Sequence, residues 1–315
     1  LYVDIIFLRE VTMEKINCNQ FQLLNYYKKN RELYRKLGKR LERFLKQSFE
    51  KEKIIYHSIT SRAKTRESFQ KKVERKGYTC IEEATDLCGL RVITFLESET
   101  KIVENFLRHT FIIDETNSVD KSDTLGEDKV GYKSIHLVAT LPKNLLELPE
   151  FERFDGLKFE IQVRTILQHA WAEVEHDKNY KFSGQLPTDI KRRFKLLAGF
   201  LEIADREFES ISKEITEYEK KVVNTIEGNT LHEIEINSTS LRKYLNKKFN
   251  ITFSQGISPK IIKLLHDNNI STLEDFSKIE DLEIMKKYFG NGSKKFPARY
   301  DLMIKNLLDY REKQS

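Results

Sequence analysis

Residues 158–181, KFEIQVRTILQHAWAEVEHDKNYK, join an alternating stretch to a stretch with helical spacing. In the first part, Phe159, Ile161 and Val163 alternate with polar residues, and residues two apart share one face of a β-strand. The opposite face carries a different set of side chains: Lys158, Glu160, Gln162 and Arg164. The pattern predicts a strand with one face against a core. Its other face would line a polar pocket, which suits a highly charged ligand.

The helix expected after this strand carries two stripes. The apolar stripe consists of Leu167, Ala170, Trp171 and Val174. The polar stripe, with steps of four, three and four residues, consists of His169, Glu173, His176 and Tyr180. Because this spacing differs from the HExxH pattern of zinc hydrolases, we expect His169, Glu173 and His176 to orient phosphates or the strand carboxylate. The chain also lacks GxxxxGKS/T and GxGxxG, which excludes a P-loop and a Rossmann nucleotide site.

Two cations stand in the segment HSITSRAKT, which we interpret as a loop before a helix that is capped by Thr65 and ends at Gly77. Arg62 and Lys64 occupy alternate positions in it. A guanidinium and an ammonium group at this spacing suit a polyphosphate, and the guanidinium can also stack on a base. A solvated basic loop is the alternative that the residues leave open.

The motif DLCGLRVIT places Asp86 just before a predicted strand and Arg91 on the strand. Mg²⁺ prefers one or two carboxylates together with phosphate oxygens. Asp86 and Glu160, from two different strands, therefore form a candidate two-carboxylate magnesium site. A helix or turn cap is the alternative for Asp86 alone.

The motif GYKSIHL combines an aromatic, a basic and two polar side chains in five positions. Tyr132, Ser134 and His136 share one face of the predicted strand. A tyrosine at a strand entry can stack on a nucleobase, a contact worth about 1–3 kcal/mol. A core tyrosine with a satisfied hydroxyl is the alternative.

Periodicity divides the 315 residues into four expected segments. They are an N-terminal helical segment (1–52), a domain of α/β or α+β class (53–205), a long helix continuing from it (206–228) and a small helical domain (229–315). In the second segment, strands that alternate with helices predict layers around a sheet. The three main expected strands are Leu90–Leu96, Ser134–Leu141 and Leu157–Arg164.

Composition narrows the classes of function. A net charge of +6 does not by itself indicate general nucleic-acid binding. No apolar run approaches the ~20 residues of a membrane span, and the opening LYVDIIFLRE lacks the basic start of a signal peptide. Three widely separated cysteines indicate reduced thiols, so we expect a cytoplasmic protein without a membrane partner. Met13 is an alternative translation start that the sequence leaves open.

Taken in order, SRAKTRESF, DLCGLRVIT, GYKSIHL and FEIQVRTILQHAWAEVEHDKNYK resemble the RelA/SpoT alarmone synthetase family across about half of the chain. The resemblance implies a nucleotidyltransferase-like mixed β-sheet flanked by helices, followed here by an all-helical C-terminal region. It also implies a magnesium-dependent GTP/GDP pyrophosphokinase of the stringent response. Such an enzyme transfers pyrophosphate from ATP to the 3′-hydroxyl of GDP or GTP and makes (p)ppGpp.

The same resemblance assigns roles to individual residues. It implies that Arg62, Lys64 and Arg91 bind ATP. It assigns catalysis and Mg²⁺ binding to Asp86 and Glu160. It assigns the acceptor nucleotide to a larger set: Tyr132, Lys133, Ser134, His136, Gln162 and Arg164.

Departures from the family pattern leave other functions open. Asp128 stands where many members have a lysine four residues before the tyrosine, and an acidic group there would repel nucleotide phosphates. A toxin-like relative that pyrophosphorylates the 3′ end of tRNA is therefore the alternative, and a catalytically inactive nucleotide- or RNA-binding protein is a third hypothesis. The segment before Tyr56 is too short for the hydrolase domain of long members, so we expect synthesis without hydrolysis.

The tail carries signals for short helices. Ser258 precedes Pro259, and Ser271 with Glu274 matches a capping box. Two short helices joined by a polar turn weakly resemble a helix-hairpin-helix. Contact with nucleic acid, packing, homo-oligomerisation and control by a partner all remain open for this region.

Overall fold

The computed structural model describes residues 20–120, 134–181, 186–228, 230–249, 257–280 and 298–312. The chain divides into two compact units, Leu1–Glu209 and Ser210–Ser315. The boundary between the units falls within one long helix, α8 (Thr188–Gly228). Tyr132, Lys133 and Asp128 lie outside the described residues, so the interpretations that depend on them concern parts that the structure does not describe.

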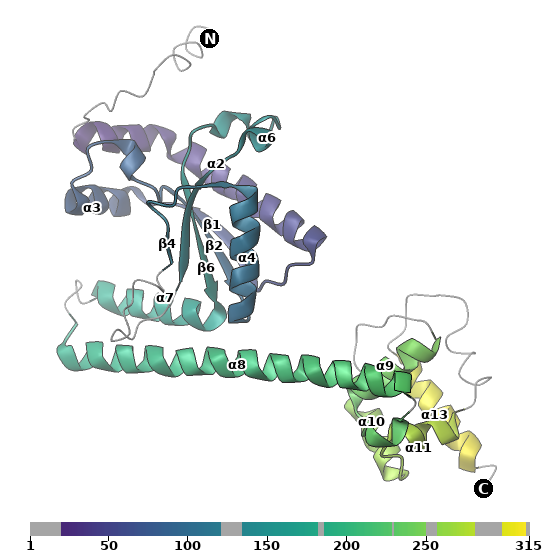
Figure 1. Ribbon diagram of the computed structural model, residues 1–315. Coiled ribbons are helices and arrows are strands. Elements are labelled where there is room, and N and C mark those ends of the chain that lie inside the picture. Colours follow the sequence, from purple (N-terminus) through teal and green to yellow (C-terminus); the bar gives the residue numbers. More distant parts are fainter. Residues whose placement is uncertain are drawn as a thin grey trace. The chain divides into compact units, whose positions relative to one another are not determined.

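The first unit is built on one mixed sheet (Figure 1). Within the described residues, the sheet has the strand order β1-β2-β6-β5-β3, and β4 pairs with β5 off this path. The strands are β1 (Ser58–Ala63), β2 (Cys88–Thr94), β3 (Ile112–Ile113), β4 (Val119–Asp120), β5 (Ile135–Thr140) and β6 (Phe159–Thr165). Strands β2 and β6 run parallel, whereas the other paired strands run antiparallel. The predicted mixed sheet with flanking helices is therefore confirmed.

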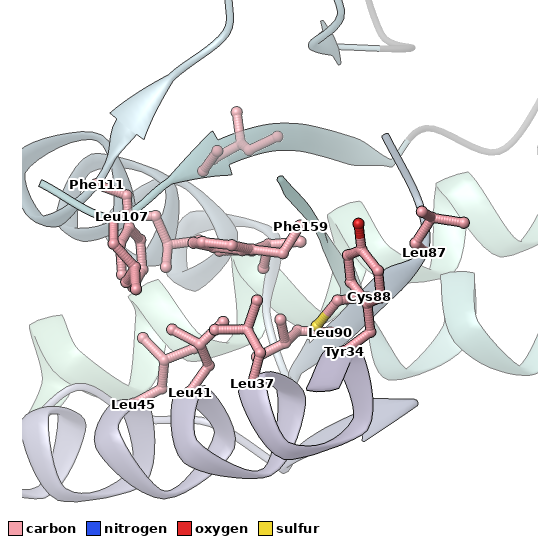
Figure 2. Packing of buried hydrophobic residues seen from close by; sticks show 14 of the residues in the cluster. Tyr34, Leu37, Leu41, Leu45, Leu87, Cys88, Leu90, Leu107, Phe111 and Phe159 are labelled. Carbon is pink, nitrogen blue, oxygen red and sulfur yellow. The ribbon is translucent and has the colours of Figure 1, made fainter. Parts of the chain in front are cut away.

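Helices α2 (Gln20–Glu52) and α4 (Glu97–Thr110) contact β1, β2 and β6 and enclose the main core with them. The other helical segments described in this unit are α3 (Arg66–Lys76), η1 (Ile81–Glu83), α6 (Lys143–Leu146), η2 (Glu152–Phe154), α7 (Ile166–Lys181) and the first part of α8. In Figure 2, Leu37, Leu41 and Leu45 of α2 point toward Leu90 and Phe159 of the sheet. Leucines spaced by four residues on one helix face thus pack against alternate residues of the strands.

Helix α3 begins and ends as its sequence predicts. The side chain of Thr65 accepts a hydrogen bond from the backbone N–H of Ser68, which confirms the predicted cap. Gly77 ends the helix with φ 67°, a left-handed conformation that glycine adopts without a steric penalty. Phe69 and Val73 are buried, so α3 turns this face toward the core.

The predicted loop HSITSRAKT is wrong in part, because Ser58–Ala63 form strand β1. β1 pairs antiparallel with β2, with Ser61 opposite Leu90 and Arg62 opposite Gly89. Ile59 is its one fully buried apolar side chain, and so the segment carries too little local alternation to reveal a strand. Pairing with β2 and cover by α2 supply the stabilisation instead.

The second unit is helical. It contains the end of α8, η3 (Leu231–Glu233), α9 (Ser238–Phe249), α10 (Pro259–Asp267), α11 (Leu273–Ile279) and α13 (Ala298–Glu312) around its own apolar core. The Ser258 side chain accepts a hydrogen bond from the Lys260 N–H, as the Ser-Pro pair predicts. The predicted capping box is displaced by one residue, because Thr272 pairs with Asp275. Among the described residues, no helix combines the length and apolar character that a membrane span requires.

Leu41→Ala should strongly destabilise the first unit. Leu41 is fully buried in the main core, so the truncation removes packed atoms and leaves a cavity. We expect the free energy of unfolding to fall by about 2–5 kcal/mol, measured by urea titration followed by circular dichroism. Ile102→Ala on α4 is the control, because its side chain is exposed and its truncation should change the value by less than about 0.5 kcal/mol. Equal effects of the two substitutions would contradict the assigned core.

Candidate active site

One face of the sheet is polar across four neighbouring strands. On β6, Phe159, Ile161 and Val163 are buried while Glu160, Gln162 and Arg164 are half-buried, which confirms the predicted alternation. The strand register extends this face sideways, since residues opposite one another in paired strands point to the same side. The opposed pairs on this face are Arg62 with Gly89, Gly89 with Glu160, Arg91 with Gln162, and Gln162 with His136.

A small cavity of about 80 Å³ opens on this polar face, and we call it the acidic cavity. Both candidate acids line it, Asp86 from the turn before β2 and Glu160 from β6. The predicted site residues that line it with them are Arg62, Lys64, Arg91 and Gln162. The fold therefore gathers, at one place, acids and cations that lie up to a hundred residues apart in the chain.

Asp86 is held by two ammonium groups. Its Oδ2 lies 2.5 Å from Nζ of Lys64 and 2.9 Å from Nζ of Lys72. Its Oδ1 is buried and has no hydrogen-bond donor among the described residues. Burial works against the charged form of Lys72, but its contacts with Asp86 outweigh burial and raise the pKa of Lys72. One carboxylate oxygen of Asp86 is thus available to a ligand that supplies positive charge.

Sequence reasoning missed Lys72. The signal was present, because Lys72 lies on α3 between Phe69 and Val73, both of which face inward. A lysine next to an inward stripe can extend its stem along apolar surface and place its ammonium group in a pocket.

Glu160 is fixed by two neighbours on the sheet. Nδ1 of His136 donates to Glu160 Oε1 at 2.5 Å, and the Gln162 amide donates to the same oxygen at 3.0 Å. The Ser134 hydroxyl lies 2.8 Å from the other ring nitrogen of His136. Burial alone would raise the pKa of Glu160, but the hydrogen bond and charge of His136, the Gln162 amide and the charge of Lys72 together lower it to about 2. The carboxylate is therefore ionised throughout the neutral pH range.

This lowered pKa predicts a contribution to stability that depends on pH. The pKa of Glu160 is below the ordinary value of 4.5, so its stabilisation is present above about pH 4.5 and is lost as pH falls toward about 2. Glu160→Gln should remove that part of the pH dependence. We expect the stability difference between the native chain and Glu160→Gln to be larger at pH 6 than at pH 3, measured as urea midpoints. The same difference at both pH values would contradict the assigned environment.

The acidic cavity fits a magnesium ion held jointly with phosphates. Asp86 offers an unpaired oxygen, and Glu160 supplies a second carboxylate in the same cavity. Within the described ranges, no group of three or more His, Cys, Asp or Glu side chains forms a cage for a metal. Mg²⁺ typically takes one or two protein carboxylates together with substrate phosphates and water. The two acids therefore suit an ion that arrives with a nucleotide.

A larger cavity of about 390 Å³, which we call the arginine cavity, lies between this face and α7. Arg62, Arg91 and Arg164 all line it. Nε of Arg164 is buried without an acceptor in the described part of the chain. Burial and the charge of Arg91 lower the pKa of the Arg164 guanidinium. Three guanidinium groups around one cavity make a strong site for a polyanion.

The apolar stripe predicted on α7 is wrong. Val174 is half exposed and Ala170 is also exposed, whereas Gln168, Trp171 and Glu175 line the arginine cavity. The helix is turned in this way because it faces a charged cavity, and residues at spacings of three and four from Gln168 point there.

The three supporting residues predicted on α7 all lie near this cavity. Glu173 Oε1 is 2.8 Å from Nη1 of Arg91, and Nδ1 of His169 is 4.0 Å from the same carboxylate oxygen. Burial lowers the pKa of His169, and the nearby Arg91 and Arg164 act in the same direction, against Glu173. His176 lines the cavity as well. Glu173 thus orients one of the arginines.

These features define a binding site for a polyanion, with two carboxylates beside clustered cations on a mixed sheet. A family model described as the region found in RelA / SpoT proteins matches residues 61–185. The GTP pyrophosphokinase YjbM of Bacillus subtilis is 33% identical over 162 residues, which cover 50% of this chain and 73% of that protein. This chain belongs to the RelA/SpoT family, which confirms the resemblance seen in its motifs.

Solved structures agree with this assignment. The small alarmone synthetase 1 from Bacillus subtilis has a TM-score of 0.52 at 27% identity, over 61% of this chain and 99% of that chain. The same synthetase bound to its product pppGpp has a TM-score of 0.50 at 29% identity, over 60% of this chain and 98% of that chain.

Proposed function

We propose that this chain is a small (p)ppGpp synthetase, which transfers pyrophosphate from ATP to the 3′-hydroxyl of GDP or GTP. The observation that carries the proposal is the acidic cavity, where Asp86 and Glu160 lie together with Arg62, Lys64 and Arg91. The relative YjbM is named a GTP pyrophosphokinase, and a structural neighbour binds pppGpp. Both findings support a pyrophosphotransferase.

The transfer exchanges one P–O bond for another. The 3′-oxygen of the acceptor attacks the β-phosphorus of ATP, the bond from that phosphorus to the oxygen bridging the α-phosphate breaks, AMP leaves, and the proton of the 3′-hydroxyl passes to solvent. Chemistry of this kind depends mainly on positioning and on positive charge around the phosphate oxygens. Arg62, Arg91 and Lys64, which line the acidic cavity, would bind the triphosphate. Asp86 and Glu160 would hold Mg²⁺, which neutralises phosphate charge when it is bound.

Glu160 is better suited to orient the attacking hydroxyl than to remove its proton early. A carboxylate whose pKa is about 2 is a weak base, although it is a good hydrogen-bond acceptor. Its fixed position between His136 and Gln162 would hold the 3′-hydroxyl in line with the β-phosphorus. Ser134, His136, Gln162 and Arg164 would surround the acceptor in this arrangement, together with Tyr132 and Lys133.

The acceptor assay tests the proposal. Purified chain is incubated with Mg²⁺, ATP labelled at the γ-phosphate, and GDP, GTP or uncharged tRNA. We expect label on the guanine nucleotides and none on tRNA. ATP labelled at the α-phosphate is the control, because that phosphate leaves with AMP and should label no acceptor. Label on tRNA alone would replace the proposal by the tRNA-modifying alternative, and no label on any acceptor would favour an inactive binding protein.

A further inference from the structure

Helix α8 carries a buried carboxylate that has no part in the transfer described above. Asp205 is 4% exposed, and its Oδ2 accepts a hydrogen bond of 2.8 Å from the hydroxyl of Thr165. Thr165 is fully buried and is the last residue of β6, directly after Arg164. The Asp205 carboxylate therefore contacts the chain at the point where β6 ends and α7 begins.

The Thr165 hydroxyl also caps α7. It accepts a hydrogen bond of 3.1 Å from the N–H of Gln168, while the Gln168 side chain accepts one of 2.9 Å from the N–H of Thr165. This reciprocal pair is a capping box, which fixes the first turn of a helix. A hydroxyl has a single hydrogen to donate, and here it goes to Asp205. Asp205 therefore fixes the rotation of the hydroxyl on which the cap depends.

The direction of α7 matters because the helix forms one wall of the arginine cavity. Glu173 on α7 pairs with Arg91, and Trp171 lines the same cavity as Arg62. A second attachment supports the same geometry, since the Trp171 indole N–H lies 3.4 Å from the backbone oxygen of Phe194 on α8. Helix α8 thus contacts Trp171 within α7 and, through the buried Asp205, the residue that caps α7.

We propose that Asp205 is a positioning residue for the nucleotide site. Through the Thr165 hydroxyl, its carboxylate sets the direction of α7, and through Glu173 it sets the place of Arg91. The inference rests on the proposed function in so far as it concerns turnover. Its structural part, the placement of α7 by Asp205, stands on the hydrogen bonds themselves.

Turnover provides the first test. Asp205→Ala should raise KM for ATP by about 10- to 100-fold with a smaller change in kcat, because it displaces a wall of the binding cavity rather than a reacting group. Asp205→Asn keeps an acceptor oxygen and should stay within about threefold of the native chain. Asp189→Ala, the same change at an exposed position of α8, is the matched control and should have no effect.

A double substitution separates positioning from general damage. Thr165→Val removes the hydroxyl at nearly constant volume and should reproduce the KM effect of Asp205→Ala. Thr165→Val removes the hydrogen bond to Asp205 together with the capping hydrogen bond from the Gln168 N–H. Because Asp205 acts only through this hydroxyl, Asp205→Ala combined with Thr165→Val should be no worse than the more impaired single variant. Effects that multiply in the double variant would overturn the proposal. Thr165→Val also keeps the test open if Asp205→Ala fails to fold.

A spectroscopic readout is independent of turnover. Trp171 is the chain's single tryptophan and lies on α7. We expect Asp205→Ala and Thr165→Val to shift its emission to longer wavelength and to raise its quenching by iodide about twofold, with native circular dichroism. Unchanged emission with unchanged KM would overturn the inference even in an active synthetase. If the native chain transferred no pyrophosphate, the proposed function would fail, whereas the emission of Trp171 would still decide the role of Asp205.

Discussion

Glu160→Gln is expected to lower the rate of pyrophosphoryl transfer by about 10²- to 10⁴-fold while the protein stays folded. The substitution preserves the shape of the side chain and removes its charge. The amide can no longer offer two acceptor oxygens, so it loses either the hydrogen bond from His136 or its contact with the acceptor hydroxyl. It also removes one of the two carboxylates of the acidic cavity. Initial rates with saturating ATP and GDP measure the loss.

The control for this prediction is Glu150→Gln, the same change at an exposed position of the same unit. It should leave the rate unchanged. Thermal unfolding of Glu160→Gln at neutral pH should show the same cooperative transitions as that of the native chain, which separates lost chemistry from lost structure. Turnover of Glu160→Gln equal to that of the native chain would refute the role of Glu160.

Asp86→Asn should have an effect of similar size for a different reason. The substitution removes the negative charge that Lys64 and Lys72 face, and leaves a single oxygen to serve either these lysines or the candidate magnesium site. We expect the rate to fall by at least about a hundredfold, and half-maximal activity of the residual enzyme to require more Mg²⁺. Two cations left close together should also reduce the free energy of unfolding by about 1–3 kcal/mol.

Asp155→Asn is the matched control, since Asp155 is exposed in the same unit. It should change neither the rate nor the Mg²⁺ requirement. The stability of Asp86→Asn can be measured without substrate, so the ion-pair role and the catalytic role are tested separately. A variant that is destabilised as expected but retains the native rate would assign Asp86 to structure alone.

Local patterns predicted the strand that carries the site. The alternation of β6 is a property of seven consecutive residues, and a period of two has one structural meaning when one face is apolar. The cap at Thr65 and the end of α3 at Gly77 are also local, and the sequence indicated both. The family resemblance predicted that the separate motifs meet at one site, which no local pattern could predict.

Features that depend on distant contacts were missed. Strand β1 has little apolar character of its own and owes its conformation to its pairing with β2. The face that α7 turns inward depends on the charged cavity that it lines, so the apolar stripe predicted the wrong inward face. Asp205 gave no signal at all in the sequence, because an aspartate on an amphipathic helix is usually solvated and its hydroxyl partner lies in another element.

The position of β6 in the sheet has a consequence for biosynthesis. β6 lies between β2 and β5 although it follows both along the chain, so the middle of the sheet is laid down last. Until β6 has left the ribosome, the edge of β2 that β6 later covers stays unpaired. Pairing between β2 and β6 also forms slowly, because the two strands lie far apart along the chain. A nascent polypeptide that ends before β6 therefore holds Asp86 without Glu160, and lacks one of the two carboxylates that line the acidic cavity.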